Sequence, residues 1–174
     1  MIYIVRGNFK EREASHIAWK VLDDILKKEL GVSLNKLTIK KNEFGKPYIE
    51  ENSSIKFNIS HCDGIAVCGV GGGEFGVDVE KIRTFNKKVA MRICSKEELQ
   101  CIDDSTYPEK QFFIYWTLKE SLGKALGVGL NYSMREVTFT LKKTEISCSL
   151  EGYEFMLYEL YSKYLLAICV PRGV

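Results

Sequence analysis

The stretch EASHIAWKVLDDILKKEL, residues 13–30, places apolar side chains three or four positions apart. This spacing puts them on one face of a helix, and Gly31, which follows directly, is suited to end one. The apolar face consists of Ala14, Ile17, Ala18, Val21, Leu22, Ile25, Leu26 and Leu30. We therefore predict a long helix with one broad buried side.

Segments rich in strand-forming residues lie on both sides of this helix. Turn residues separate them, as is typical of antiparallel strands, and Gly71-Gly72-Gly73 predicts a hairpin turn between the last two. The segments are 2–5, 37–40, 48–49, 55–60, 65–70 and 75–79.

The second half of the chain repeats this order of helix and strands. Residues 86–101 favour helical structure, with a capping box that begins at Ser95. Pro108 predicts the start of a longer helix that ends near Leu126, before Gly127. Strands are expected near residues 137–141, 146–150, 155–161 and 164–170.

These patterns predict an α+β protein of two similar lobes, each with a long helix packed on a small, mostly antiparallel sheet. We place the N-terminal lobe at residues 1–82 and the C-terminal lobe at residues 83–174, related by a pseudo-two-fold.

The composition excludes several classes of protein. The chain has 174 residues, 45% hydrophobic and 28% charged, which excludes disordered, collagen-like and coiled-coil proteins. Lys and Arg number 25 against 23 Asp and Glu, and this balance argues against a dedicated nucleic-acid binder. The apolar run 164–170 is too short to cross a bilayer, and Arg6 interrupts any signal-peptide core. We expect a soluble cytoplasmic protein without a nucleic-acid or membrane partner.

The cysteines point to packing rather than to metal or disulfide chemistry. No C-x-x-C pair occurs and only two histidines are present, which argues against a structural zinc site. Several cysteines lie inside apolar runs, where they are expected to act as small buried hydrophobic residues. The cysteines are residues 62, 68, 94, 101, 148 and 169.

Asp78 and Glu80 form the first candidate site. Residues i and i+2 of a strand face the same side, so the two carboxylates would project together. Adjacent carboxylates repel each other unless a cation lies between them, and carboxylate oxygens suit Mg²⁺. The alternative is a solvated strand end with two acids on its wet face.

Trp116, Glu120 and Lys124 form the second candidate. They are four residues apart along the predicted helix, so they share one stripe. Glu120 could add a third carboxylate to a metal site, and Lys124 could neutralise a phosphate. The alternative is an ordinary surface Glu–Lys pair beside a core tryptophan.

Two further motifs could contact an anion. Ser60 ends the predicted strand 55–60 and His61 follows it, and both could donate hydrogen bonds to phosphate oxygens. Lys46 lies in a Gly-Lys-Pro turn and could do the same. Structural roles for the serine and histidine, and a solvated turn lysine, are the alternatives.

These motifs occur in one order: GKP at 45–47, FNISH at 57–61, GVDVE at 76–80 and WTLKESLGK at 116–124. In this combination the chain resembles the 4′-phosphopantetheinyl transferases, specifically the monomeric, two-lobed Sfp-like class with holo-acyl-carrier-protein synthase activity. The resemblance implies the fold of that family, with the active site in the cleft between the two lobes. It also implies Mg²⁺-dependent transfer of the 4′-phosphopantetheine arm of coenzyme A to a serine hydroxyl of an apo acyl or peptidyl carrier protein, with release of 3′,5′-ADP.

The resemblance also implies roles for individual residues. Asp78, Glu80 and Glu120 would hold Mg²⁺ on the diphosphate of coenzyme A. Lys124 would contact a phosphate oxygen, and Glu120, or a water that it orients, would take the serine proton. Glu120 and Lys124 would thus be the catalytic residues.

Three more residues would bind coenzyme A. By the same resemblance, Ser60 and His61 would contact its 3′-phosphate or diphosphate, and Lys46 would lie against its adenine end. Larger family members carry more N-terminal sequence with lysines near the 3′-phosphate, whereas only Lys10, Arg12 and His16 occupy this region here.

The segment after the Asp-x-Glu motif is the expected docking surface for an acidic carrier protein. Its basic residues could steer the carrier, and apolar residues between them could contact a carrier helix. A solvated basic helix face is the alternative. The basic residues are Lys81, Arg83, Lys87, Lys88, Arg92 and Lys96.

Two other functions remain open at this point. A Mg²⁺-dependent phosphohydrolase or nuclease could use the same three acids with water as nucleophile. A coenzyme A or nucleotide-binding module could keep the fold without catalysis, although all three acids are present.

Overall fold

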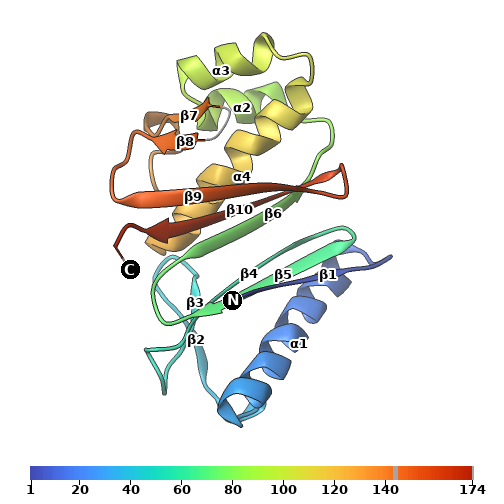
Figure 1. Cartoon of the computed structure of the whole chain (residues 1–174), viewed down its shortest axis with the longest axis vertical. Coiled ribbons are helices and arrows are strands. Elements are labelled where there is room, and N and C mark those ends of the chain that lie inside the picture. The colour runs from blue at the N-terminus through green and yellow to red at the C-terminus, as the bar shows by residue number, and fades with distance from the viewer. Residues whose placement is uncertain (143–144, 174) are drawn as a thin grey trace.

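The computed structural model describes residues 1–142 and 145–173 and contains two three-stranded antiparallel sheets (Figure 1). The first sheet has the strand order β1-β5-β4, with a separate hairpin of β2 and β3. Its elements are β1 Ile2–Arg6, α1 Glu11–Leu30, the 3₁₀ turn η1 Leu34–Lys36, β2 Ile39–Lys41, β3 Pro47–Ile49, β4 Lys56–Cys62 and β5 Ile65–Gly71.

The second sheet has the strand order β6-β10-β9, with a separate hairpin of β7 and β8. Helix α4 packs against β6 and β10, while α2 and α3 lie at the outer end of this half (Figure 1). The elements are β6 Gly76–Lys81, α2 Lys87–Ile93, α3 Lys96–Asp103, α4 Pro108–Leu126, η2 Met134–Glu136, β7 Phe139–Lys142, β8 Glu145–Cys148, β9 Tyr153–Leu160 and β10 Tyr164–Pro171.

The predicted α+β architecture, with one long helix for each small sheet, is confirmed. The apolar stripe of α1 is buried against β4 and β5 through Ala14, Ala18 and Leu22. The Ser95 capping box also forms, and Gly127 ends α4 with φ at +76°, in the left-handed region that favours glycine. The two halves therefore repeat one plan of helix on sheet.

The predicted hairpin between residues 65–70 and 75–79 is wrong. Strand β5 pairs with β1 and β4, whereas β6 pairs with β10. The chain changes sheets here because β6 packs directly against the backbone of α4. A Cβ atom on Gly76 would lie 1.8 Å from the Ser121 carbonyl oxygen, so only glycine permits this approach. The chain passes from the first sheet to the second between β5 and β6. The lobe boundary after residue 82 stays a prediction.

The two sheets meet where β4 lies beside β6, and side chains make the connection. Asn58 Oδ1 accepts from the Val77 N–H at 3.0 Å, and Ser60 Oγ accepts from the Val79 N–H at 3.1 Å. Asn58 and Ser60 are both buried. Two side chains of β4 thus accept hydrogen bonds from backbone N–H groups at the edge of β6, which would otherwise be buried without a partner.

Several cysteines are buried, as the apolar runs around them predict. All six cysteines are free, and Cys62, Cys68, Cys94 and Cys169 are buried. Among the described residues, no helix combines the length and apolar character that crossing a membrane requires.

Candidate active site at the junction of the two sheets

Asp78 lies on β6 at the junction with β4 and contacts both halves of the molecule. Its Oδ1 accepts from Lys124 Nζ at 2.8 Å and from Ser60 Oγ at 2.9 Å. The residue is only 5% exposed, and its Oδ2 is buried without a hydrogen-bond partner among the described residues. An unpartnered carboxylate oxygen in a buried position is costly, so this oxygen is suited to receive a ligand.

Glu80 follows on the same side of β6, and both of its oxygens are engaged. Oε1 accepts from the Trp116 indole N–H at 3.0 Å, and Oε2 accepts from Arg83 Nη1 at 2.8 Å. Burial raises the pKa of Glu80 and the neighbouring Asp78 raises it further, while Arg83 acts in the opposite direction. A second carboxylate is therefore held close to the first at an electrostatic cost.

Glu120 projects from α4, one helical turn from both Trp116 and Lys124. Its pKa is raised to about 7, mainly by burial and also by the charges of Asp78 and Glu80, against the opposing effect of Lys124. The three acids predicted from the sequence are therefore electrostatically coupled, although they come from a strand and a helix. Their combined charge favours a nearby cation.

A hard divalent cation fits these residues chemically. Carboxylate oxygens are the ligands that Mg²⁺ prefers, and the buried Asp78 Oδ2 is available. Within the described part of the chain, however, no three His, Cys, Asp or Glu side chains are already grouped to hold a metal ion. Instead, Lys124 contacts Asp78 Oδ1 and Arg83 contacts Glu80 Oε2. A metal ion bound to these acids would compete with the two positive charges.

The coupling predicts that Glu120→Gln stabilises the metal-free protein at pH 8, by about 2–4 °C in the midpoint of thermal unfolding. The folded pKa is near 7 and the ordinary value is 4.5, so between these values the folded protein keeps a proton that the unfolded chain releases. Wild-type stability therefore falls as the pH rises from 4.5 to 7, and glutamine removes this loss. Thermal unfolding of both proteins from pH 4.5 to 8 measures the difference between their midpoints, which should vanish near pH 4.5. A difference that does not change with pH would contradict the electrostatic argument.

Ser60 and His61 have different environments although they are adjacent on β4. Ser60 is occupied by its hydrogen bonds to Asp78 and Val79. His61 Nδ1 is buried and has no partner in the residues that the structure describes. Burial lowers the pKa of His61, and Lys124 also lowers it, which favours the neutral imidazole.

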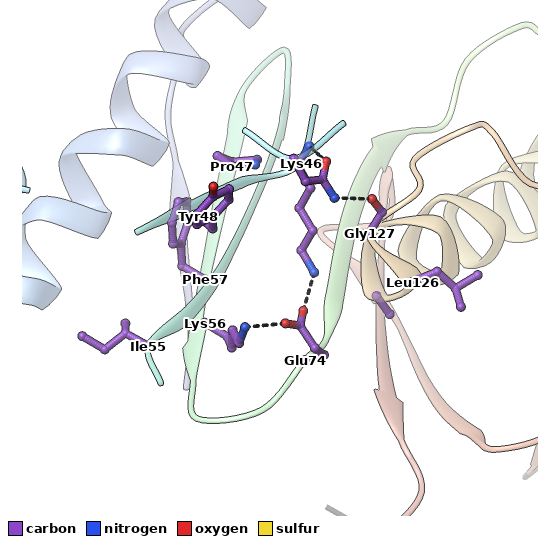
Figure 2. A pocket seen from close by; sticks show the side chains of 11 residues that line it. Lys46, Pro47, Tyr48, Ile55, Lys56, Phe57, Glu74, Leu126 and Gly127 are labelled. Atoms are coloured by element: carbon purple, nitrogen blue, oxygen red, sulfur yellow. Dashed lines mark hydrogen bonds and ion pairs between the residues drawn. The ribbon is translucent and has the colours of Figure 1, made fainter. Parts of the chain in front are cut away.

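Lys46 lies directly before β3, and Figure 2 shows its side chain facing Glu74. Lys46 Nζ contacts Glu74 Oε2 at 2.7 Å, and Lys56 Nζ contacts Glu74 Oε1 at 2.7 Å. The three side chains border a cavity of about 380 Å³ between the β2–β3 hairpin and the end of α4. Asn42 connects these elements because its Nδ2 donates to the Gly127 carbonyl at 2.7 Å.

A second cavity brings three of the predicted residues together. It has a volume of about 200 Å³, and Lys46, Glu120 and Lys124 line it. Asn58 lines it too, whereas the predicted residues Asp78, Glu80, Ser60 and His61 do not. The turn, the strand and the helix predicted separately from the sequence therefore face one space.

Sequence reasoning missed Asn42, Asn58 and Glu74. Asn58 alternates with Ser60 along β4, so a period of two could have placed it on the face that meets β6. Asn42 precedes the Gly-Lys-Pro turn, where asparagine often bonds to the backbone of a turn. For Glu74 no local signal exists, because both lysines that it contacts belong to other elements.

Comparison with known proteins identifies the family. Residues 74–169, more than half of the chain, match the model of the 4′-phosphopantetheinyl transferase superfamily. The chain belongs to this superfamily, as the resemblance in its motifs predicts. The matched region contains β6 and α4, which carry the acids and Lys124.

Individual relatives agree with this assignment. A 4′-phosphopantetheinyl transferase of Bacillus subtilis is 32% identical over 138 residues, covering 75% of this chain and 61% of its own length. The 4′-phosphopantetheinyl transferase gsp of Aneurinibacillus migulanus is 30% identical, covering 71% of this chain and 52% of its own length. The chain thus spans between half and two thirds of these relatives.

A solved structure supports the fold. Holo-[acyl-carrier-protein] synthase from Neisseria meningitidis aligns with a TM-score of 0.50 at 17% identity, covering 57% of this chain and 98% of that protein. At this identity the likeness concerns the fold alone.

Proposed function

We propose that this protein transfers the 4′-phosphopantetheine arm of coenzyme A to a serine hydroxyl of an apo carrier protein and releases 3′,5′-ADP. The main supporting observation is the contact between Asp78 and Lys124, which are 46 residues apart and carry the two family motifs. Membership of the superfamily and the names of the relatives agree with this activity. We include action as a monomer in the proposal, because residues from both halves of one chain line the same cavity.

Coenzyme A would bind along the two cavities beside Lys46. Lys124 would contact a diphosphate oxygen, and Lys46 would lie against the adenine end. His61, rather than Ser60, keeps a ring nitrogen free for the 3′-phosphate or the diphosphate, because Ser60 Oγ already bonds to Asp78 and Val79. Neither residue lines the two cavities, so such a contact would be made beside them. Ser60 would then act by fixing the position of Asp78.

The acids Asp78, Glu80 and Glu120 would hold Mg²⁺. When bound, the ion would neutralise charge on the diphosphate during transfer. Release of Lys124 from Asp78 would free its ammonium group for a phosphate oxygen. The chain would thereby exchange an internal ion pair for contacts with the substrate.

The transfer step itself needs a proton acceptor. The serine oxygen of the carrier forms a bond to the phosphorus that bears the pantetheine arm. The bond from that phosphorus to the oxygen of the departing 3′,5′-ADP breaks. Glu120, or a water that it orients, would receive the serine proton.

The carrier protein would dock on α2 and the segment that follows α4. A groove of about 490 Å³ is lined by Val89, Ile93, Trp116 and Leu130, with Arg92 and Arg135 also on its wall. Carrier proteins are typically acidic near the modified serine, so apolar walls with basic residues would suit them. Arg83, Lys87 and Lys88 are exposed nearby and would add to the attraction.

Arg92→Glu should raise the KM for an acidic carrier about tenfold with little change in kcat, because like charges would then face each other. Steady-state labelling at several salt concentrations measures this effect, which should shrink as salt increases. Lys20→Glu provides the matched control, since Lys20 is exposed on α1 in the other half. An equal rise in KM for both variants would argue against docking at α2.

Intact-protein mass spectrometry of an apo acyl carrier protein tests the function as a whole. The carrier, coenzyme A and Mg²⁺ are incubated with the protein, with and without EDTA. We expect the carrier to gain one phosphopantetheine, and EDTA to prevent the gain. Coenzyme A binding without labelling of several fatty-acid and peptidyl carriers would favour a binding module. Hydrolysis of coenzyme A without labelling would favour a phosphohydrolase.

A further inference from the structure

Arg83 follows β6 and folds back onto a proposed metal ligand. Its Nη1 donates to Glu80 Oε2 at 2.8 Å and to the Lys81 carbonyl at 3.0 Å. Its guanidinium carbon lies 4.7 Å from the centre of the Phe113 ring, within the range of a cation–π contact. Three separate contacts therefore hold a positive charge against Glu80.

Asp78 and Glu80 differ in how many of their carboxylate oxygens are available to a ligand. Asp78 keeps one oxygen without a partner, but both oxygens of Glu80 are engaged, by Trp116 and Arg83. Trp116 is a neutral donor and leaves the charge of the carboxylate in place. Arg83 is a cation 2.8 Å from Oε2. A metal ion bound to Glu80 would therefore meet a like charge at close range.

The surroundings of Arg83 allow it to leave at small cost. Its side chain is 55% exposed, whereas that of Glu80 is only 17% exposed. A half-exposed guanidinium regains water when it moves away, so the ion pair it gives up is weak. The carboxylate remains fixed by Trp116 when Arg83 departs. The mobile partner of this pair is therefore the arginine.

We propose that Arg83 competes with the divalent cation for Glu80 and so weakens cation binding by the free protein. The inference rests on the proposed function only in taking Asp78, Glu80 and Glu120 as the ligands. Arg83 is a positioning residue here, since it acts through Glu80 and not on the substrate. In the absence of metal it neutralises part of the charge that the three acids bring together.

Cation binding by the free protein, without coenzyme A or carrier, tests this directly. A Trp19→Phe background leaves Trp116 as the single tryptophan, and its fluorescence reports on Glu80 through their hydrogen bond. Mg²⁺ titrations followed by this fluorescence, and Mn²⁺ titrations followed by electron paramagnetic resonance of the free ion, give the dissociation constants. We expect Arg83→Ala to bind both ions about two- to fivefold more tightly, the range that loss of an exposed ion pair allows.

Two further variants separate this mechanism from a general charge effect. Arg83→Lys restores the positive charge and should return affinity towards that of the background protein. Lys88→Ala removes an exposed charge on α2 that forms no ion pair within the described residues, and should leave affinity unchanged.

Several results would overturn the inference. Arg83→Ala binding no more tightly than the background would do so, as would an equal gain in Lys88→Ala or an absence of cation binding in every variant. The proposed function fails separately: an absence of carrier labelling, with tighter cation binding in Arg83→Ala, would reject the transfer activity and support the role of Arg83.

Discussion

Asp78→Ala and Asp78→Asn should each lower the rate of carrier labelling about a hundredfold or more. The expected size follows from the several kcal/mol that a bound metal ion contributes in such reactions, at 1.36 kcal/mol for each factor of ten. Both variants remove the carboxylate whose Oδ2 is buried without a partner among the described residues. Asparagine keeps an oxygen that can accept from Ser60 Oγ, so the junction between β4 and β6 should survive. Glu120→Ala should abolish labelling in the same way.

Mass spectrometry of the carrier over time, together with circular dichroism of each variant, measures this prediction. Glu159→Gln is the control. Glu159 lies on the edge strand β9, and its carboxylate pairs with Lys110 of α4. That variant should label the carrier at the wild-type rate. Substantial labelling by a folded Asp78→Asn protein would remove Asp78 from the metal site and would weaken the assignment of Glu80 with it.

Lys119→Met should lower the free energy of unfolding by about 3–5 kcal/mol, the usual cost of leaving a buried charge without its partner. Lys119 Nζ contacts Glu98 Oε2 at 3.0 Å, and both side chains have no exposed surface. Nζ also donates to the carbonyls of Met134, at 2.7 Å, and Val137. Without the lysine, Glu98 would remain charged in the core or would have to take up a proton.

The loss should extend beyond the ion pair, because Glu98 also anchors its surroundings. Its Oε1 accepts from the Phe139 N–H at 2.8 Å, and its Oε2 accepts from the Ser95 N–H at 2.8 Å. The pair thus joins α3, α4 and the start of β7. Its lysine, Lys119, directly precedes Glu120 in the sequence. Urea unfolding measures the change. The double variant Glu98→Gln/Lys119→Met should recover part of the loss, because neither charge remains. A loss below about 1 kcal/mol in Lys119→Met would show that the buried pair contributes little.

Lys119 shows how far a motif alone can be interpreted. The sequence WTLKESLGK places Lys119, Glu120 and Lys124 on one helix, and their spacing predicts neighbours at four residues. Glu120 and Lys124 indeed line one cavity. The adjacent Lys119 points about 100° away around the helix and is fully buried. The helical period predicts that Lys119 and Glu120 lie on different sides of α4. Only the packing of the helix decides which of these sides faces the core.

The sequence by itself determined the elements, because they depend on local chemistry. The apolar stripe of α1, the capping box at Ser95 and the glycine after α4 specify where helices begin and end over a few residues. The acids of the Asp-x-Glu motif share one side of β6 because the side-chain period of a strand is two. These features need no knowledge of distant residues.

Only the tertiary structure decided which elements meet, because these contacts join residues far apart in the chain. Gly76 lets β6 approach the backbone of α4, so β6 joins β10 and does not form a hairpin with β5. That choice brings Asp78 to Lys124 and leaves the edge of β6 for Asn58 and Ser60 to satisfy. The pairing of strands distant in sequence depends on packing over the whole core, and a local pattern does not carry that information.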